Sequence, residues 1–353
     1  MSGMIPYFEP QDATPNPFPE RPTGYPKAWT RATLRREDYL FPIPQDCLRE
    51  LATALASQEA RSIPTLQLTP ERFELAACRA FMGKVKETLD DGVGFAVLDR
   101  LPLDVLSKDE AKAAYWLLGL MIGSPYFQAS YGEKAELLSD VMDLSNYGAD
   151  PDEPLPPRLE NYGRLAHGAR GDITNSRLVM HTDFSHAVKP PRYVGLLCLQ
   201  TALQGGETRL ISWHSVFNEL LTNHPQLARR GFRAFLQHRQ QIQARDETPF
   251  MSKPLFTYER GFRMQYSSRL VRTGYREAGV PLDEETERFL DTVDDIIANG
   301  ELRTEFFMEP GQIQIVTNDE CGHERTEYKD PPDPAKRRHM VRLHLQEKDR
   351  PIA

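Results

Sequence analysis

Before about residue 130, apolar residues recur at helical spacing in two stretches of the chain. Ser107 and Glu110 form a capping box, which marks the start of one helix. Thr69 followed by Pro70 marks the start of the other, because Thr is a good cap and Pro is tolerated at the first helical position. The expected elements are helices over 70–89 and 107–121 and a short buried strand over 93–98.

From about residue 137 the chain carries short β-prone runs separated by clusters of Pro, Gly, Asn and Asp. This texture predicts an antiparallel sandwich or barrel. Two helices interrupt it. One follows Trp213, and the other is capped by Asp283 and ends at Asn299 and Gly300. The predicted strands cover 178–182, 192–199, 208–212, 235–242, 262–266, 312–318 and 339–345.

The first 26 residues contain seven prolines, so this segment is neither a helix interior nor a central strand. It is either a tail or an extended arm laid over the body. The sequence has no internal repeat and no clear linker. We therefore expect residues 1–60 to hold the Pro-rich segment and the start of a helical cover, and residues 61–353 to form one domain.

The charge and the distribution of apolar residues exclude several classes of function. The net charge is −8 with no basic stripe, which argues against nucleic acid as a partner. No apolar run approaches the roughly 18 residues that span a membrane, and the N-terminus has no signal-peptide pattern. A cytoplasmic protein acting on a small molecule is expected, with homo-oligomerisation left open. Four scattered cysteines form no CxxC pair and predict no disulfide framework: Cys47, Cys78, Cys198 and Cys321.

The motif His181-Thr182-Asp183 is the first candidate for chemistry. Residues two apart on a strand share a face, so the imidazole and the carboxylate can bind one metal together. A further histidine completes the facial triad of non-haem Fe(II) oxygenases and leaves three positions open. About one His-x-Asp/Glu is expected by chance in a chain with nine histidines and 51 acidic residues, so the pair alone does not establish a site.

Three further motifs follow in order, namely Gly205-Gly206-Glu207-Thr208, the segment 318–323 that ends in His323, and Arg337 to Arg342. Together with the His-x-Asp they resemble the TauD/TfdA-like family of Fe(II)/2-oxoglutarate oxygenases, the taurine dioxygenase family. Thr208 lies 27 residues after His181, as in that family. Arg338 and Arg342 lie 15 and 19 residues after His323, which makes the last loop slightly longer than in some members. The resemblance covers roughly residues 92–346.

The resemblance implies a mainly β fold with helices, in which helices flank a double-stranded β-helix, or jelly-roll, core. It implies that His181, Asp183 and His323 bind Fe(II), and that Thr208 and Arg338 hold the distal carboxylate of 2-oxoglutarate. The implied activity couples decarboxylation of 2-oxoglutarate to succinate and CO2, with O2 as the other co-substrate, to hydroxylation or desaturation. An amino acid derivative or a secondary-metabolite intermediate is the expected substrate.

Strand parity gives independent support. In a strand over 338–345 the side chains of Arg338, Met340, Arg342 and His344 share one face, which would line the barrel. Arg338 and Arg342 are then roughly 13 Å apart, too far to bind the same carboxylate group. We expect Arg342 to bind an anionic group of the substrate or the keto acid end, with an internal salt bridge as the alternative. Phe184 and Ser185, directly after the motif, would border the substrate.

Two other interpretations of these residues are open. The same His/Asp/His set could hold zinc in a metallohydrolase, although Thr208 and Arg338 then have no purpose. A jelly roll that binds a ligand without catalysis is the second alternative. Among the neighbours, His214 is expected at the surface or as a helix cap, and Tyr266 on the substrate side.

Overall fold

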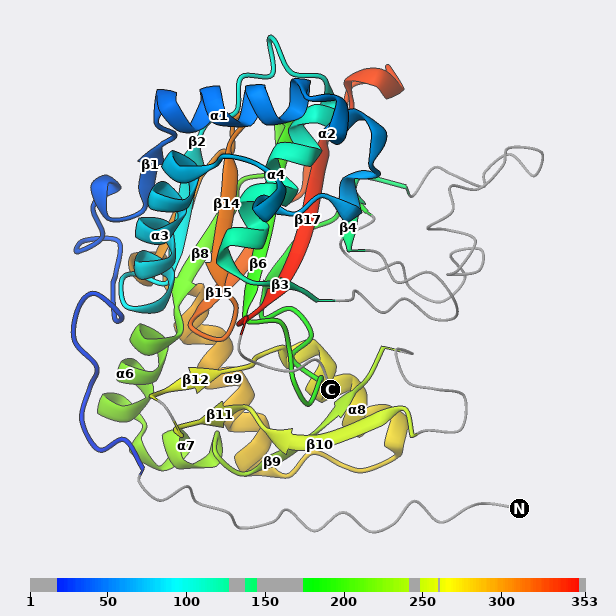
Figure 1. Cartoon of the computed structure of the whole chain (residues 1–353). Coiled ribbons are helices and arrows are strands. Elements are labelled where there is room, and N and C mark those ends of the chain that lie inside the picture. Colours follow the sequence, from blue (N-terminus) through cyan, green and yellow to red (C-terminus); the bar gives the residue numbers. More distant parts are fainter. Residues whose placement is uncertain (1–17, 127–136, 145–173, 241–247, 260, 349–353) are drawn as a thin grey trace.

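Two β-sheets form the core of the computed structural model, which describes residues 18–126, 137–144, 174–240, 248–259 and 261–348 (Figure 1). The larger sheet contains β1 (Leu40–Pro42), β2 (Phe95–Asp99), β3 (Ser124–Pro125), β4 (Leu138–Val141), β6 (Tyr193–Gln200), β14 (Ile313–Thr317) and β17 (His339–Gln346). Its order is β1-β2-β14-β6-β17-β3, and β4 also pairs with β17. The smaller sheet contains β5 (Leu178–His181), β8 (Thr208–Ser212), β13 (Arg303–Phe306) and β15 (Cys321–Arg325), in the order β13-β8-β15-β5.

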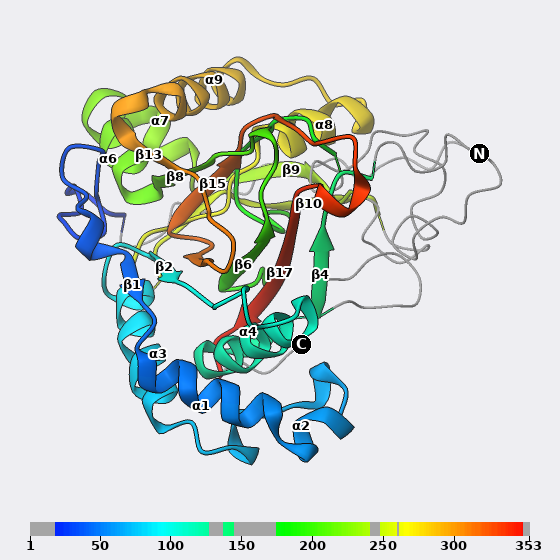
Figure 2. The ribbon, with the colours of Figure 1, turned by 90° about the horizontal axis from the view of Figure 1, so that it is seen from above.

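Helices cover the outer face of the larger sheet, as Figures 1 and 2 show. They are α1 (Gln45–Ala56), α2 (Gln58–Ser62), α3 (Ala76–Asp90) and α4 (Lys108–Ile122). Short 3-10 turns lie at Arg36–Asp38, Thr65–Gln67, Pro70–Arg72, Gly300–Leu302 and Pro334–Lys336.

A second group of elements packs below the smaller sheet and is called the lower module (Figure 1). Its helices are α6 (Trp213–Asn223), α7 (Pro225–Arg230), α8 (Ser268–Ala278) and α9 (Glu284–Ala298), and its strands are β9 (Ala234–His238), β10 (Phe250–Pro254), β11 (Phe256–Thr257) and β12 (Arg263–Met264). One further short pair, β7 (Gln204–Gly205) with β16 (Tyr328–Lys329), adjoins the smaller sheet.

Side chains of β17 point alternately to the face of the sheet that the helices cover and to the interior between the sheets. Val341, Leu343 and Leu345 belong to the apolar cluster formed with α1, α3 and α4. The side chains between them, Arg342 and His344, are buried on the opposite face. This arrangement confirms the parity predicted from the sequence, and with it the expected jelly-roll core flanked by helices.

The predicted helix starts were right at two positions and wrong at one. Ser107 and Glu110 form the reciprocal capping box, and Asp283 accepts the N–H of Thr286 at the start of α9. The helix expected from Pro70 begins instead at Ala76, after a 3-10 turn. The cap is supplied from a distant part of the chain, because Glu50 on α1 accepts the backbone N–H groups of residues 77 and 78.

The described part of the N-terminal segment lies against α6. Thr23 exchanges two hydrogen bonds with Asn218, through its N–H (2.9 Å) and its carbonyl (2.8 Å). Phe18 packs edge-on against Phe232. Residues 18–26 therefore form an arm on the body, whereas the prolines at positions 6, 10, 15 and 17 lie outside the described residues. The division of the chain at residue 60 stays a prediction.

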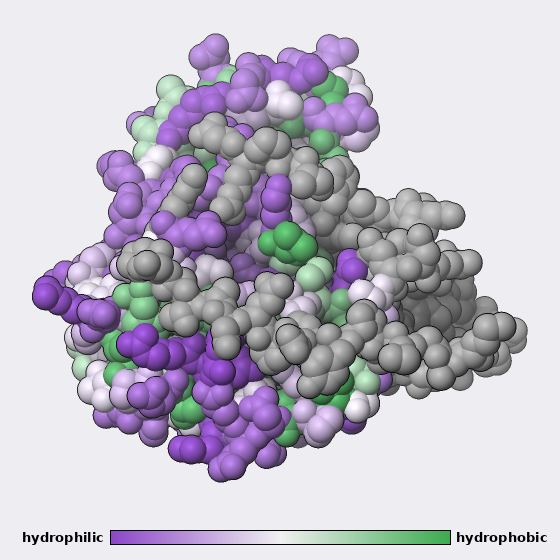
Figure 3. Space-filling view, turned by 90° about the horizontal axis from the view of Figure 1, so that it is seen from below, coloured by the Kyte–Doolittle hydropathy of each residue, from purple (hydrophilic) through white to green (hydrophobic). Residues whose placement is uncertain are grey.

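The described surface in Figure 3 is mostly hydrophilic, with hydrophobic residues in small groups between the polar ones. Single exposed apolar side chains such as Val105 and Val280 are ordinary for a protein surface. Among the helices that the structure describes, none has the length and apolar character needed to cross a membrane.

His214 is a correction to the sequence analysis. It lies in α6 but is neither exposed nor the cap, since Ser212 accepts the N–H of Ser215 and His214 is only 6% exposed. Its Nδ1 is 3.3 Å from Thr23 Oγ1. Its environment explains the error, because the N-terminal arm covers this face of the helix. Burial lowers the pKa of His214 to about 4.

His214→Gln should flatten part of the acid dependence of stability. Below the unfolded pKa of about 6.5 the unfolded chain binds a proton that the folded chain rejects until about pH 4. Wild-type protein should therefore lose up to roughly 3 kcal/mol relative to the variant as the pH falls from 6.5 to 4. Urea denaturation across this range measures the difference.

The control is His224→Gln, which changes an exposed histidine just past the end of the same helix. Its unfolding free energy should follow that of wild-type protein with pH. If the unfolding free energy changes with pH equally in wild-type protein and in His214→Gln, protonation of His214 does not destabilise the folded state.

Candidate metal centre

Antiparallel pairing of β5 with β15 brings two histidines together. His181 is the register partner of His323, and their ring centroids are 4.4 Å apart. Asp183 follows just after β5, with Oδ1 3.1 Å from His181 Nε2 and 3.6 Å from His323 Nε2. One ligand atom from each residue lies within 4.8 Å of the other two, so the three side chains can hold one metal ion.

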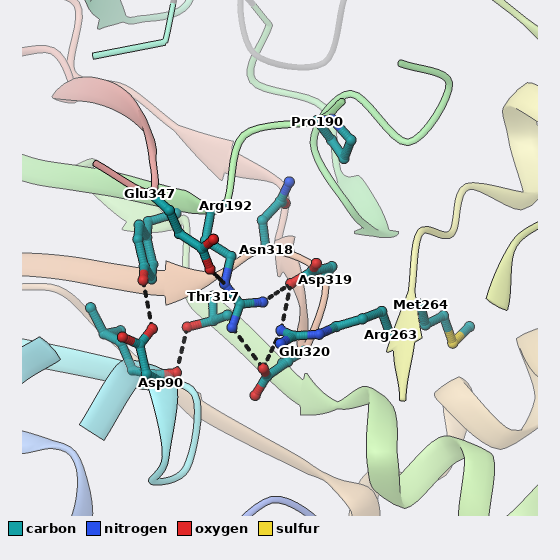
Figure 4. Close-up of polar contacts among 12 residues, drawn as sticks. Asp90, Pro190, Arg192, Arg263, Met264, Thr317, Asn318, Asp319, Glu320 and Glu347 are labelled. Carbon is teal, nitrogen blue, oxygen red and sulfur yellow. Dashed lines mark hydrogen bonds and ion pairs between the residues drawn. The ribbon is translucent and has the colours of Figure 1, made fainter. Parts of the chain in front are cut away.

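Asn318 holds the backbone of Asp183 in place. Its carboxamide Oδ1 accepts the Asp183 N–H (2.9 Å), and its Nδ2 donates to the Asp183 carbonyl (2.9 Å) and to the Pro191 carbonyl (3.0 Å). Asn318 is fully buried. Figure 4 shows it beside Asp319 and Glu320, in the loop that leads from β14 into the strand bearing His323. Asp183 and His323, which are 140 residues apart in the sequence, are thus connected through one short loop.

Buried charges fix the next two residues of that loop. Arg192 forms ion pairs with Asp319, with Glu320 (2.9 Å) and with Glu347 (3.4 Å) (Figure 4). Glu320 also pairs with Arg263 of β12 and with Lys27, which directly follows the N-terminal arm. The cluster joins the larger sheet, the lower module and the arm at the base of the metal centre.

The protonation states suit metal binding. Burial alone would raise the pKa of Asp183, but hydrogen bonds from three histidines and the charge of Arg342 hold it well below its usual value. Burial lowers the pKa of His323, and the neighbouring His181 lowers it further. His181 Nδ1 lies 2.9 Å from the Val179 carbonyl oxygen, which holds the ring in place. A carboxylate and two imidazoles therefore face one point.

β17 supplies two more neighbours of Asp183. His344 Nε2 is 2.7 Å from Asp183 Oδ2, and Arg342 Nη1 is 3.7 Å from the same oxygen. Burial lowers the pKa of His344 to about 4, although Asp183 acts in the opposite direction. The geometry places Arg342 beside the Asp183 carboxylate, in agreement with the internal salt bridge that the sequence offers as an alternative. It also lines the cavity described next.

A cavity of about 560 Å³, part of it open to solvent, extends from the metal centre between the sheets. Asp183 and His323 line it together with Thr208 and Arg338, so the structure brings two of the three expected ligands and the expected carboxylate-binding pair to one space. Its remaining wall includes apolar residues: Val141, Val194 and Leu196.

The Gly205-Gly206 turn delivers Thr208 to this cavity. Both glycines have positive φ, +74° and +84°, which other residues rarely adopt. A Cβ on Gly205 would lie 2.2 Å from the Glu327 carbonyl oxygen, and one on Gly206 would lie 3.5 Å from Arg338 Nε. Gly205 can therefore approach β16 only because it has no side chain, and Gly206 is favoured by its positive φ.

Arg338 is a buried cation with an unmet hydrogen-bonding group. It is 6% exposed, its Nη1 has no hydrogen-bond partner among the described residues, and its guanidinium carbon lies 5.1 Å from the centre of the Tyr328 ring. Burial lowers its pKa, yet a guanidinium stays charged in proteins. A buried charge of this kind calls for an anion, and a carboxylate matches its fork of donors.

The segment that directly follows the His-x-Asp motif does not line this cavity. Phe184 has φ +54° and packs edge-on against His344, with ring centroids 5.2 Å apart. Ser185 is buried, and its Oγ has no hydrogen-bond partner among the described residues. Lys253 of β10 holds the same segment by donating to the Ala187 carbonyl (2.6 Å). Tyr266 is fully buried and donates to Asp294, so the substrate-side location considered for it was wrong.

The comparisons with known proteins agree with this geometry. The family model of the taurine catabolism dioxygenase TauD, TfdA family matches residues 64–344. The chain therefore belongs to this family, which confirms the resemblance seen in the motifs and defines the protein as a dioxygenase. The match also favours the oxygenase over the zinc hydrolase and the non-catalytic jelly roll.

Two curated relatives cover most of the chain. FR-33289 synthase of Streptomyces rubellomurinus is 25% identical over 335 residues, which are 92% of this chain and 91% of that protein. The taurine hydroxylase-like protein SAT17 of Stachybotrys chartarum is 27% identical over 313 residues, 87% of this chain and 75% of that protein.

Solved structures share the fold. An asparagine oxygenase in complex with Fe(II), 3-hydroxyasparagine and succinate superposes with a TM-score of 0.61 at 17% identity. The non-haem iron oxygenase OrfP in complex with Fe and α-ketoglutaric acid gives 0.62 at 14% identity. Each alignment covers 88% of this chain and 94% of the other. Fe(II), with 2-oxoglutarate and O2 as co-substrates, is the cofactor set of this family, and the donor set here fits it.

Asn318 and His344 are the residues that the sequence analysis missed. His344 was placed on the interior face of its strand but was given no role there. Asn318 was noted only as the end of a strand. A histidine on the same interior face as Arg338 and Arg342 is the signal that could have drawn attention to His344, whereas nothing local in the sequence connects Asn318 with a backbone 135 residues away.

Asn318→Ala should weaken both the fold and the metal site. It leaves one N–H and two carbonyl groups buried without partners, which costs about 2–3 kcal/mol of unfolding free energy. Affinity for Fe(II) should fall about 10- to 100-fold, because the Asp183 backbone is released. Denaturant unfolding and anaerobic calorimetric titration measure the two effects.

Asn299→Ala is the matched control, since Asn299 caps an exposed 3-10 turn. It should cost about 1 kcal/mol and leave the Fe(II) affinity unchanged. Wild-type metal affinity in Asn318→Ala would mean that Asp183 is positioned without this clamp.

Proposed function

We propose that the protein uses His181, Asp183 and His323 to bind Fe(II), and that it hydroxylates or desaturates a small organic substrate with 2-oxoglutarate and O2. One observation carries the assignment. Two members of the three-residue donor set, Asp183 and His323, line the same cavity as the buried guanidinium of Arg338. A metal with three open positions and a cation for a distant carboxylate are what a chelating keto diacid requires.

When bound, Fe(II) and 2-oxoglutarate supply the oxidising chemistry, in which 2-oxoglutarate is converted to succinate and CO2 as the substrate is oxidised. The chain's own residues supply position and charge. Asp183 is the one carboxylate of the donor set, so the site leaves positive charge on the metal for an anionic chelator. Arg338 and the Thr208 hydroxyl neutralise the other end of the co-substrate.

The substrate that we propose is an amino acid derivative or an intermediate of secondary metabolism that carries an anionic group. The asparagine oxygenase and OrfP structures hold hydroxylated amino acids, and FR-33289 synthase aligns over most of the chain, which supports this class. Arg342 supports the anionic group, because it lines the cavity next to the metal ligands. Its planar fork of donors can serve an acceptor besides Asp183.

Phe184 and Ser185 are proposed to border the substrate. They follow Asp183 directly, and Lys253 fixes the segment that contains them. The cytoplasmic location and the state of oligomerisation stay predictions.

The reaction class can be tested by mass spectrometry. Purified protein with Fe(II), ascorbate and 2-oxoglutarate should release succinate when a metabolite extract is added, and one metabolite should gain one oxygen or lose two hydrogens. His181→Ala removes a ligand, so it should abolish both Fe(II) binding and succinate release. Wild-type turnover by His181→Ala, or substrate turnover at the same rate without 2-oxoglutarate, would contradict the proposal.

The co-substrate role of Arg338 has its own test. Arg338→Gln should raise the KM for 2-oxoglutarate by at least about 30-fold, equivalent to about 2 kcal/mol, while Fe(II) affinity changes little. Arg337→Gln is the matched control on the same turn, because Arg337 is not part of the cavity lining. An unchanged KM in Arg338→Gln would exclude the assignment.

A further inference from the structure

His344 is buried in the interior face of β17 and touches the carboxylate ligand. It is 0% exposed, and its Nε2 lies 2.7 Å from Asp183 Oδ2. An ionised carboxylate only accepts hydrogen bonds, so the proton of this contact belongs to His344 Nε2. This interaction goes beyond the set of residues that hold the metal or the co-substrate.

The two oxygens of Asp183 have different surroundings. Oδ1 is the oxygen near both metal-binding nitrogens, at 3.1 Å from His181 Nε2 and 3.6 Å from His323 Nε2. Oδ2 faces β17, where His344 is within hydrogen-bonding distance and Arg342 Nη1 lies at 3.7 Å. Among the residues that the structure describes, His344 makes a hydrogen bond of normal length to Oδ2, and it therefore orients the carboxylate.

The imidazole is itself confined. The Phe184 ring packs edge-on against it at 5.2 Å, and the Tyr126 ring does so at 6.4 Å. The backbone of His344 is tied to the same neighbour, because Tyr126 N–H donates to the His344 carbonyl (2.8 Å). With rings on these sides, the imidazole has little freedom to turn away from Oδ2, and the donor is fixed before any metal binds.

A carboxylate binds a cation through one oxygen or through both. A second Fe–O bond from Asp183 would use one of the three positions that 2-oxoglutarate and O2 need. We propose that His344 is a positioning residue whose Nε2–H occupies Asp183 Oδ2, so that Asp183 binds iron through Oδ1 alone and the three positions stay open. This inference rests on the proposed function, in which His181, Asp183 and His323 hold Fe(II).

The test compares His344→Phe, which keeps an aromatic ring but has no donor, with His344→Gln, which can still donate to Oδ2. Anaerobic titrations should measure Fe(II) affinity first and 2-oxoglutarate affinity of the Fe(II)-loaded protein second, the latter by the visible charge-transfer band of the chelate. His344→Phe should keep Fe(II) affinity within about threefold and bind 2-oxoglutarate about 10- to 100-fold more weakly, with a smaller band. His344→Gln should keep most of the wild-type affinity for 2-oxoglutarate and most of the band intensity.

A matched control and a second measurement separate this role from a general effect on folding. His214→Gln changes another buried histidine, on α6, and should leave both affinities unchanged. In wild-type protein, the infrared carboxylate stretches that shift on metal binding should show the wide separation of a one-oxygen complex. If His344→Phe does not fold, His344→Gln and the infrared measurement still decide the question.

Two outcomes overturn the inference while the proposed function survives. One is wild-type 2-oxoglutarate binding in His344→Phe, and the other is a two-oxygen infrared signature in wild-type protein that turns over substrate. An equal loss of Fe(II) and 2-oxoglutarate affinity would also overturn it, because His344 would then support the ligand set in general. Failure of wild-type protein to bind Fe(II) at all would instead remove the proposed function.

Discussion

The antiparallel register between β5 and β15 is the constraint on which the site depends. It sets His181 opposite His323, and it places Asp183 where the chain leaves the strand. A slip of one residue would turn one of the two imidazoles to the other face of the sheet. The register is supported on the far side of β15, where five consecutive residues pair with β8 and bring Thr208 opposite Arg325.

The loop between β14 and β15 converts this register into a fixed geometry. Asn318 holds the Asp183 backbone, and the next two residues are held by buried ion pairs with Arg192 and Arg263. Buried ion pairs add little net stability when they form, but losing one partner leaves a buried charge and is costly. These buried ion pairs hold the loop in one conformation, and they also make substitutions in the loop costly. Side chains beside the larger sheet, in the lower module and just after the arm all contact this loop.

The sequence was sufficient for the class of fold and for the family, because both depend on patterns that repeat along the chain or on motifs in a fixed order. Alternation in 338–345 predicted which side of β17 faces the interior, and the structure agrees. The start of α3 could not be predicted, because its cap comes from Glu50 on another helix. The burial of His214 depends on an arm that is 190 residues earlier in the chain. Contacts of this kind have no local signature, and the same holds for Asn318.

The segment from Phe184 to Pro190 differs in kind from the strands around the metal. The strands hold the ligands through sheet pairing, whereas this connection is held by a few side chains, chief among them Lys253 of β10 in the lower module. Exchange of residues in the connection or in the paired strands β9 and β10 leaves the pairing of β5 with β15 intact. With Phe184 and Ser185 in their proposed position beside the substrate, a mutant library aimed at selectivity belongs in this connection and in β10.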